Sequence, residues 1–303
     1  MSRMPPGALF RLVRFQFLPV ILSPVIAGTA LAWWTSRVFS PSIFTLVILG
    51  SVLLHLAANA IDDAYDYQSG VDVASNAMFP PDFGGWKPLP RGIVTLRKAK
   101  ELAYLFFLAS LIVGLYLTFA VGPLVFVLGA IGAFFGYFHV APPVRLGYRG
   151  MGEAGVAVSF GLLPAVGSFL VQTRTVTASS ILVGIPLGLL TATILMNHDQ
   201  IFYEPYRQKA KRSLTVILGR QRSMWTAFLL TLMSYAIVIL AIPAGLLPLT
   251  SLAVLLSLPL FARQIQLYRA RVHSPPHYVK LTVTTFLLSV AFGLLLSLGL
   301  VLG

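Results

Sequence analysis

Residues 59–72 read Asn59-Ala60-Ile61-Asp62-Asp63-Ala64-Tyr65-Asp66-Tyr67-Gln68-Ser69-Gly70-Val71-Asp72 and directly follow a long apolar segment. They hold four of the nine acidic residues of the 303-residue chain. At helical spacing, Asn59 and the first three aspartates fall within one arc of about 100°. Clustered carboxylates repel one another unless a cation holds them together. The stretch therefore predicts a helix end crowded with oxygen ligands, a set that suits Mg²⁺ and leaves room for a phosphate.

The composition around this stretch is that of a membrane protein. Hydrophobic residues make up 57% of the chain and charged residues 10%, whereas an ordinary soluble domain carries about 25% charged residues. A membrane-spanning helix needs roughly 20 mostly apolar residues. The nine segments that fit this description lie near Phe15–Trp34, Ser42–Asp63, Ala99–Phe119, Pro123–His139, Glu153–Val171, Ser180–Asp199, Met224–Ile242, Leu249–Leu267 and Lys280–Leu302. The sequence thus predicts one all-α polytopic membrane domain over residues 1–303.

The first apolar segment permits one alternative. Ala30-Leu31-Ala32 follows a basic start, as at a signal-peptide cleavage site. The apolar run continues through Trp34, which favours a spanning helix. The chain has no cysteine, so it has neither disulfides nor thiolate chemistry.

The formal net charge of +13 is distributed unevenly. Of the 22 Lys and Arg residues, 20 fall on one side of the nine predicted segments, and Arg37 and Arg174 fall on the other. Because cytoplasmic loops are basic, this split places the N-terminus in the cytoplasm and the C-terminus outside. All nine acidic residues fall on the cytoplasmic side, so the chemistry is expected there. Basic residues in short loops are typical of membrane topology, and nucleic acid is not an expected partner.

Several basic residues lie where they could bind phosphate, which Lys meets as a point charge and Arg as a planar fork. The longest predicted loop runs from about Tyr67 to Lys98 and is rich in proline and glycine, which indicates a functional or disordered segment. The alternative for each basic residue is a role in topology alone. The candidate phosphate ligands are Lys87, Arg91, Arg145, Arg149, Lys211 and Arg212.

Two further groups could line a substrate pocket. The first follows the sixth apolar segment and contains Asn197, His198, Asp199, Tyr203, Glu204 and Tyr206. His198 could act as a base near neutral pH, or it could be structural. The second is the run from Tyr137 to Glu153, where Glu153 could face substrate or simply favour the start of a helix.

These motifs together resemble the UbiA superfamily of intramembrane prenyltransferases over nearly the whole chain. The resemblance is greatest to the branch that prenylates dihydroxynaphthoate for menaquinone biosynthesis and to its UBIAD1-like relatives. The family's first motif, N/D-x-x-x-D-x-x-x-x-x-D, matches Asp62, Asp66 and Asp72. Its R-P-L-P-x-G loop, Y-x-x-P-P-x-R-L-x-Y-R-G-x-G-E run and G-K-R-T-L-x-V-x-L-G tail match residues 87–92, 137–153 and 210–219.

The chain departs from the family in its second aspartate motif. Aligned without a gap on the tail, the two aspartates of N-N-x-x-D-x-x-x-D fall on Phe202 and Tyr206. Asp199 and Glu204 are the nearby carboxylates. Asp199 helped by Asn197 could hold a second Mg²⁺, or Lys211 and Arg212 could replace that ion with fixed charge.

The resemblance implies nine helices around a central cavity and Mg²⁺-dependent transfer of a polyprenyl group from prenyl diphosphate to an aromatic acceptor. It assigns Mg²⁺ to Asp62, Asp66, Asp72 and Asp199, and diphosphate to Lys87, Arg91, Arg145, Lys211 and Arg212. Residues expected around the acceptor or prenyl group are Asn59, Tyr137, His198, Tyr203 and Glu153. The alternatives are prenylation of a glycerol phosphate lipid, a secondary transporter with an acidic cation site, and a binding protein with weak catalysis.

Overall fold

The computed structural model describes residues 6–78, 87–270 and 272–303, and within these residues every regular element is a helix, without a strand. The elements of the main bundle are α2 (Leu18–Ser36), α3 (Pro41–Gln68), α5 (Leu96–Val121), α6 (Leu124–Phe138), α7 (Gly152–Ala157), η3 (Val158–Leu162), α8 (Leu163–Thr173), α9 (Ala178–Asp199), α12 (Arg220–Ala241), η4 (Leu249–Ser257), α13 (Leu258–Arg269) and α14 (Pro275–Leu302). The short elements are α1 (Pro6–Leu12), η1 (Phe15–Phe17), α4 (Val71–Met78), η2 (Leu146–Tyr148), α10 (Tyr203–Gln208) and α11 (Leu214–Leu218). The predicted all-α class is confirmed.

The number of spanning helices differs in part from the nine predicted. Eight helical segments of the described residues are long and apolar enough to cross a membrane. The remaining predicted segment is α6, which has 15 residues and is shorter than a usual span. Three of the eight are composite: η1 and α2 form the first, α7, η3 and α8 form another, and η4 with α13 forms the third.

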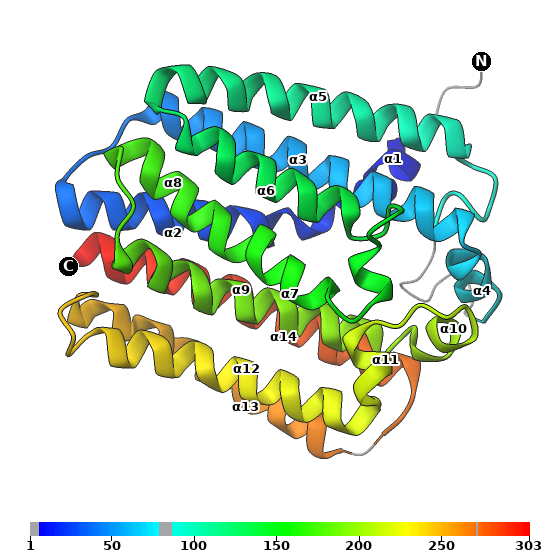
Figure 1. Ribbon diagram of the computed structural model, residues 1–303. Helices are drawn as coiled ribbons and strands as arrows, with labels where there is room; N and C mark the ends of the chain where they lie inside the picture. The colour runs from blue at the N-terminus through cyan, green and yellow to red at the C-terminus, as the bar shows by residue number, and fades with distance from the viewer. Residues whose placement is uncertain (1–5, 79–86, 271) are drawn as a thin grey trace.

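The long helices run side by side, and the short helices collect at one end of the bundle (Figure 1). α4, α10 and α11 lie at the end opposite to the C-terminus, and α1 lies toward the same end. This end is where the chain leaves α3 and α9, the two helices that carry the acidic segments found in the sequence. The arrangement brings loops that are far apart in the sequence around one polar region.

The segment predicted as a long loop between Tyr67 and Lys98 is partly helical, so this prediction was wrong in part. α3 continues to Gln68 and α4 follows at once, because Gly70 adopts φ 79° and turns the chain. A positive φ past a helix end is typical of glycine. Residues 79–86, with Pro80-Pro81 and Gly84-Gly85, lie outside the described part of the chain.

Close packing between η3 and α9 fixes the position of the second acidic helix. A side chain at Gly161 would collide with the backbone of Gly188, and one at Gly188 would collide with Ala157. Small residues let helix backbones approach closely in membranes. The contact holds the two segments that carry Glu153 and Asp199 against each other.

Candidate active site

The four aspartates of residues 59–72 are all buried. Asp62, Asp63 and Asp66 lie on the last two turns of α3, and Asp72 lies in the first turn of α4. Each of the four has an exposed fraction of 9% or less. Buried carboxylates are strongly destabilising without partners, so the groups that contact them decide what the site can do.

Arg14 is the first of these partners. Its Nη2 donates to Asp62 Oδ2 at 2.5 Å and to Asp63 Oδ1 at 2.7 Å. Arg14 adopts φ 50° between α1 and η1, a left-handed conformation that is uncommon for a residue with a side chain. Burial alone lowers the pKa of Arg14, but the two carboxylates raise it well above its ordinary value, so the guanidinium stays charged.

Lys87 links the end of α3 to α4. Its Nζ lies 2.9 Å from Asp63 Oδ1 and 2.9 Å from Asp72 Oδ1. The other oxygen of Asp72 is buried without a partner in the described residues. Burial, reinforced by Asp66 and Asp63, raises the pKa of Asp72 to about 8, although the Lys87 ammonium acts in the opposite direction.

Both oxygens of Asp66 also have partners. Lys211 Nζ donates to Oδ2 at 2.6 Å, and the hydroxyl of Tyr148 donates to Oδ1 at 2.7 Å. Burial alone lowers the pKa of Lys211, but the Asp66 carboxylate raises it, and the net value lies well above the ordinary one. Burial and the Asp66 charge raise the pKa of Tyr148, so its phenol keeps the proton that it donates.

A polar pocket of about 100 Å³ lies beside this ion-pair network. Arg14, Asp62 and Lys211 line it. Other lining groups come from α7, from the end of α9 and from the residue before α11; they are Glu153, His198, Asp199 and Ser213. Asn59 also lines the pocket, and its amide donates to the carbonyl of His55 at 2.9 Å.

His139 forms part of the pocket wall and is packed against two glycines. A side chain at Gly147 or Gly152 would collide with the imidazole, and the Gly147 N–H donates to the His139 carbonyl at 2.7 Å. Burial lowers the pKa of His139, although Asp62 opposes this, so the ring is neutral at pH 7. The glycines of the run from Tyr137 to Glu153 therefore serve close packing around this ring.

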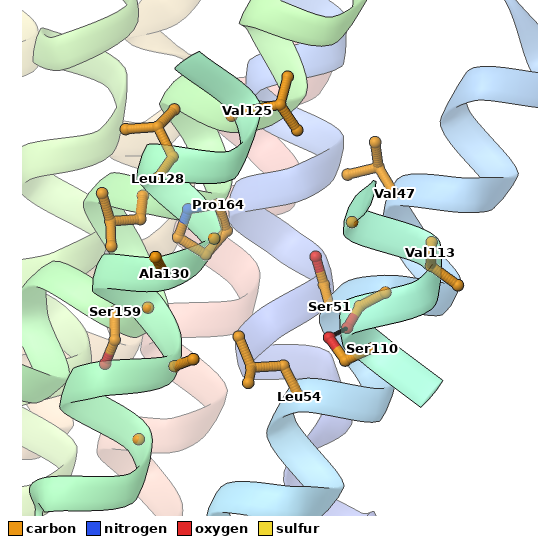
Figure 2. A pocket seen from close by; sticks show the side chains of 18 of the residues that line it. Val47, Ser51, Leu54, Ser110, Val113, Val125, Leu128, Ala130, Ser159 and Pro164 are labelled. Atoms are coloured by element: carbon orange, nitrogen blue, oxygen red, sulfur yellow. Dashed lines mark hydrogen bonds between the residues drawn. The ribbon is translucent and has the colours of Figure 1, made fainter. Parts of the chain in front are cut away.

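A larger apolar cavity of about 440 Å³ adjoins the polar pocket. Figure 2 shows it between α6 on one side and α3 with α5 on the other. Val47, Ser51 and Leu54 come from α3, and Val125 and Leu128 come from α6. The two spaces share four wall residues, namely Ala58, Gly136, Ser159 and Phe160. The site therefore consists of two adjacent spaces, a charged pocket and an apolar cavity, that meet at these residues.

Many of the residues predicted from the sequence meet in this region. Asp62, Lys211, Asn59, Glu153, His198 and Asp199 line the polar pocket, and Asp66, Asp72 and Lys87 join it through ion pairs. Arg145 adopts φ 51° and its guanidinium lies 4.8 Å from the ring centre of Tyr148.

Other predicted residues lie elsewhere. The amide of Asn197 is buried and hydrogen bonds Tyr268 and Thr285, and it does not line the pocket. Tyr137 bonds the hydroxyls of Tyr65 and Tyr104. The ring of Tyr203 packs under Arg220, and the side chains of Arg91, Arg149 and Arg212 are outside the two pockets.

Sequence reasoning gave no site role to Arg14, Tyr148 and Ser213, and it placed Asp63 in the acidic arc without assigning it a metal ion. Arg14 was counted only as a topology charge, because 48 residues separate it from Asp62. Its position directly before the first apolar segment, which begins at Phe15, was the available signal. Tyr148 and Ser213 stand within matched motifs, but nothing in their spacing indicates contacts with this pocket.

Comparisons with known proteins show the family of the chain. Residues 21–290 match the UbiA prenyltransferase family. The chain belongs to this family. It is 26% identical over 96% of its length to a 1,4-dihydroxy-2-naphthoate octaprenyltransferase of Haemophilus influenzae, covering 94% of that protein. It is 23% identical over 97% of its length to the enzyme of the same name from Bacillus subtilis, covering 92% of it.

Solved structures share the fold. A UbiA homolog from Archaeoglobus fulgidus bound to GPP and Mg²⁺ superposes with a TM-score of 0.66 at 17% identity, over 96% of this chain and 99% of that one. A UbiA homolog from Aeropyrum pernix has a TM-score of 0.66 at 15% identity, over 100% and 99% of the two chains. This UbiA protein is an integral membrane prenyltransferase, which excludes the transporter alternative.

Proposed function

We propose that this UbiA protein transfers a polyprenyl group from its diphosphate to a naphthoate-type aromatic acceptor at the cytoplasmic side of the membrane. The observation that carries the proposal is the shared wall of the two spaces. A diphosphate needs charged partners and a polyprenyl chain needs apolar ones, and here the two environments meet at Ala58 and Gly136. The bond that breaks joins those two parts of the substrate.

The diphosphate is assigned to the charged end. The carboxylates of Asp62, Asp66 and Asp72 offer the hard oxygen ligands that Mg²⁺ takes, and Asp72 Oδ2 is buried without a partner. Asp199 is assigned to a second ion. When bound, Mg²⁺ neutralises the charge that develops on the departing diphosphate. The ammonium groups of Lys87 and Lys211, with the guanidinium of Arg14, are fixed where they act on the same charge.

The prenyl chain is assigned to the apolar cavity. This cavity follows α3 from Val47 to Ala58, a distance of ~16 Å at 1.5 Å per residue. An extended chain advances about 1.2 Å per bond, so a four-bond isoprene unit takes about 5 Å. The cavity length therefore suits about three units, with the remainder of a longer chain among lipid tails.

The acceptor is assigned to the side of the polar pocket that His198 lines. Cleavage of the C–O bond leaves its electron pair on the diphosphate and an allylic cation on the prenyl chain. An electron-rich aromatic carbon bonds to this cation, and that carbon then loses a proton, or carbon dioxide from a carboxylate, which restores the aromatic ring. Apolar walls exclude the water that would compete for this cation. Phe160 lines both spaces and supplies such a wall at their junction. The named relatives support a naphthoate, since two of them carry that acceptor in their names.

The test is prenyl transfer by the purified protein in nanodiscs with Mg²⁺ and labelled geranylgeranyl diphosphate. Dihydroxynaphthoate, hydroxybenzoate and a glycerol phosphate lipid are offered separately. We expect product with dihydroxynaphthoate, and we expect Asp66→Asn to lower its rate by roughly 100-fold or more, because Asp66 orders the diphosphate end. Glu101→Gln, at an exposed carboxylate paired with Arg97, serves as the matched control and should retain the parent rate. Transfer only to the glycerol phosphate lipid would contradict the proposal.

A further inference from the structure

The six buried carboxylates at the charged end differ in their partners. Asp62, Asp63, Asp66 and Asp72 each form an ion pair with Arg14, Lys87 or Lys211. Glu153 and Asp199 have no Lys or Arg partner among the described residues. The ion pairs of Arg14, Lys87 and Lys211 therefore all go to the carboxylates of α3 and α4, and the two carboxylates on α7 and α9 form no ion pair with a Lys or Arg of the described residues.

Glu153 is the more completely isolated of the two. It is 2% exposed, and neither of its carboxylate oxygens has a hydrogen-bond partner in the described residues. The backbone N–H groups of Leu214 and Thr215, at the start of α11, lie near enough to act on it as dipoles. Its strongest charged neighbour is Asp199, which carries the same charge. A buried carboxylate in this setting is costly until a cation reaches it.

Asp199 and Ser213 complete a set of oxygen ligands. Asp199 is 2% exposed and its Oδ1 has no hydrogen-bond partner, since His198 Nδ1 lies 3.8 Å away. The hydroxyl of Ser213 is also buried and unpartnered. All three side chains line the polar pocket, and they come from three separate elements. Two carboxylates and a hydroxyl with free lone pairs suit a hard divalent cation.

We propose that Glu153, Asp199 and Ser213 form a Mg²⁺ site that fills in the absence of diphosphate, before any ion binds at the aspartates of α3. The inference rests on the proposed function for the identity of the diphosphate. No three His, Asp or Glu side chains in the described residues form a closed metal cluster. The other ligands are therefore water and, later, diphosphate oxygens, which agrees with the preference of Mg²⁺ for retaining water.

The aspartates of α3 take their ion at a later stage for an electrostatic reason. A cation arriving at Asp62 or Asp66 meets Arg14 or Lys211 already in place. Like charges at such distances repel, so metal alone competes poorly for these oxygens. A diphosphate offers Arg14 and Lys211 new partners and so releases the carboxylates. Diphosphate and metal at α3 are therefore expected to bind cooperatively, with each raising the affinity of the other.

Among the described residues, Asp62 is the one other carboxylate that lines the polar pocket. The positions where the family motif carries aspartates hold Phe202 and Tyr206, whose rings stack with centres 5.8 Å apart. The Tyr206 ring lies 4.5 Å from Lys211 Nζ. Glu204 is half-exposed and pairs with Arg220, away from the pocket lining. Glu153 thus replaces Asn197, which was expected to help Asp199 hold the second Mg²⁺.

The experiment is a titration of the full-length protein in detergent with Mn²⁺, a spectroscopic substitute for Mg²⁺, followed by electron paramagnetic resonance. In the absence of diphosphate we expect one Mn²⁺ ion to bind per chain. Glu153→Gln and Asp199→Asn should each weaken this binding by roughly tenfold or more, because each removes a charged ligand. Asp62→Asn should change it by less than about threefold, since Asp62 acts only through space. Glu204→Gln is the matched control and should bind as the parent does.

A second titration adds geranyl thiodiphosphate, which is not turned over. A further Mn²⁺ ion should then bind, and Asp62→Asn should lose that ion while keeping the first. The proposal is overturned if the parent binds no Mn²⁺ without diphosphate, or if Asp62→Asn abolishes that binding and Glu153→Gln retains it. Melting curves of each variant establish that it is folded.

Failure of this inference and failure of the proposed function give different results. If the parent transfers prenyl groups but binds no metal without diphosphate, the site is wrong and the function stands. If metal binds through Glu153 and Asp199 but no prenyl transfer occurs with any acceptor, the site stands and the function is wrong.

Discussion

At the scale of single residues, the site depends on carboxylates that the protein's own cations neutralise. Asp63 Oδ1 contacts the cationic groups of both Arg14 and Lys87. The carboxylate of Asp66 accepts hydrogen bonds from Lys211 and Tyr148. Removing one partner of a buried ion pair is strongly destabilising because it leaves the other charge unpaired. Under the proposed function, diphosphate binding rearranges the same contacts that stabilise the metal-free protein.

Asp72 gives this network a dependence on pH. Burial, with Asp66 and Asp63, raises its pKa from the ordinary 3.8 to about 8 in the metal-free protein. The folded chain then holds the proton more tightly than the unfolded chain. This group therefore contributes stability at low pH that is lost as the pH rises from 3.8 to about 8. We expect the unfolding temperature of the metal-free protein to fall over this range, and to fall less in Asp72→Asn. Equal slopes in the two proteins would contradict the assignment.

The sequence predicted most acidic residues of the site but not their partners. A helical arc was sufficient to group Asn59 with the aspartates of α3, because that contact is local. Arg14 and Lys211 reach the same carboxylates from 48 and 145 residues away, and only the packing of helices decides such pairs. The error at Asn197 is the opposite one, because the sequence assigned it to the site and the structure does not. Its amide donates hydrogen bonds to Tyr268 and Thr285 inside the bundle.

At the scale of elements, the length of the apolar segments predicted where the long helices lie. It did not predict where these helices are interrupted. The predicted Ser180–Asp199 segment is α9, which begins at Ala178 after Thr177, whose side chain accepts a bond from the Ser180 N–H. The π-helical turn η3 could not be predicted, because it depends on contacts with α9 rather than on hydrophobicity. The helix α4 within the predicted loop before α5 also depends on contacts with other elements. Its residue Val71 packs into a cluster with residues of α10 and α14.

The cavity between α3, α5 and α6 predicts a limit on chain length. Gly129 lines it, and a Cβ there would meet nothing within 4 Å. Gly129 is seven residues from Gly136 at the junction, or about 10 Å along α6. Gly129→Phe should therefore admit a chain of about two isoprene units and slow the transfer of longer chains. Rates with geranyl and geranylgeranyl diphosphate measure this, with Gly129→Ala as the control. An unchanged ratio of rates would exclude this cavity as the chain site.

At the scale of the whole molecule, the two ends of the bundle differ in charge. The short helices α4, α10 and α11 and the buried ion pairs lie at one end, and the C-terminus lies at the other (Figure 1). Arg37 and Arg174, the only basic residues predicted outside, each follow the last residue of a helix, α2 or α8. The 20-to-2 division of Lys and Arg, which required only the sequence, thus corresponds to a division of the bundle into a polar and an apolar end.

This division predicts the orientation in the membrane, because basic loops stay in the cytoplasm. The chain has no cysteine, so single cysteines can be introduced without a background. Gln208 is exposed on α10 beside the charged site, and Thr175 is exposed between α8 and α9. In sealed inside-out vesicles, a membrane-impermeant maleimide should label Gln208→Cys and leave Thr175→Cys unlabelled. In intact spheroplasts the pattern should reverse, since each probe reaches only one face. Labelling of Gln208→Cys in spheroplasts alone would place the ion-pair network outside the cell. That result would contradict the predicted orientation, in which the basic loops lie in the cytoplasm.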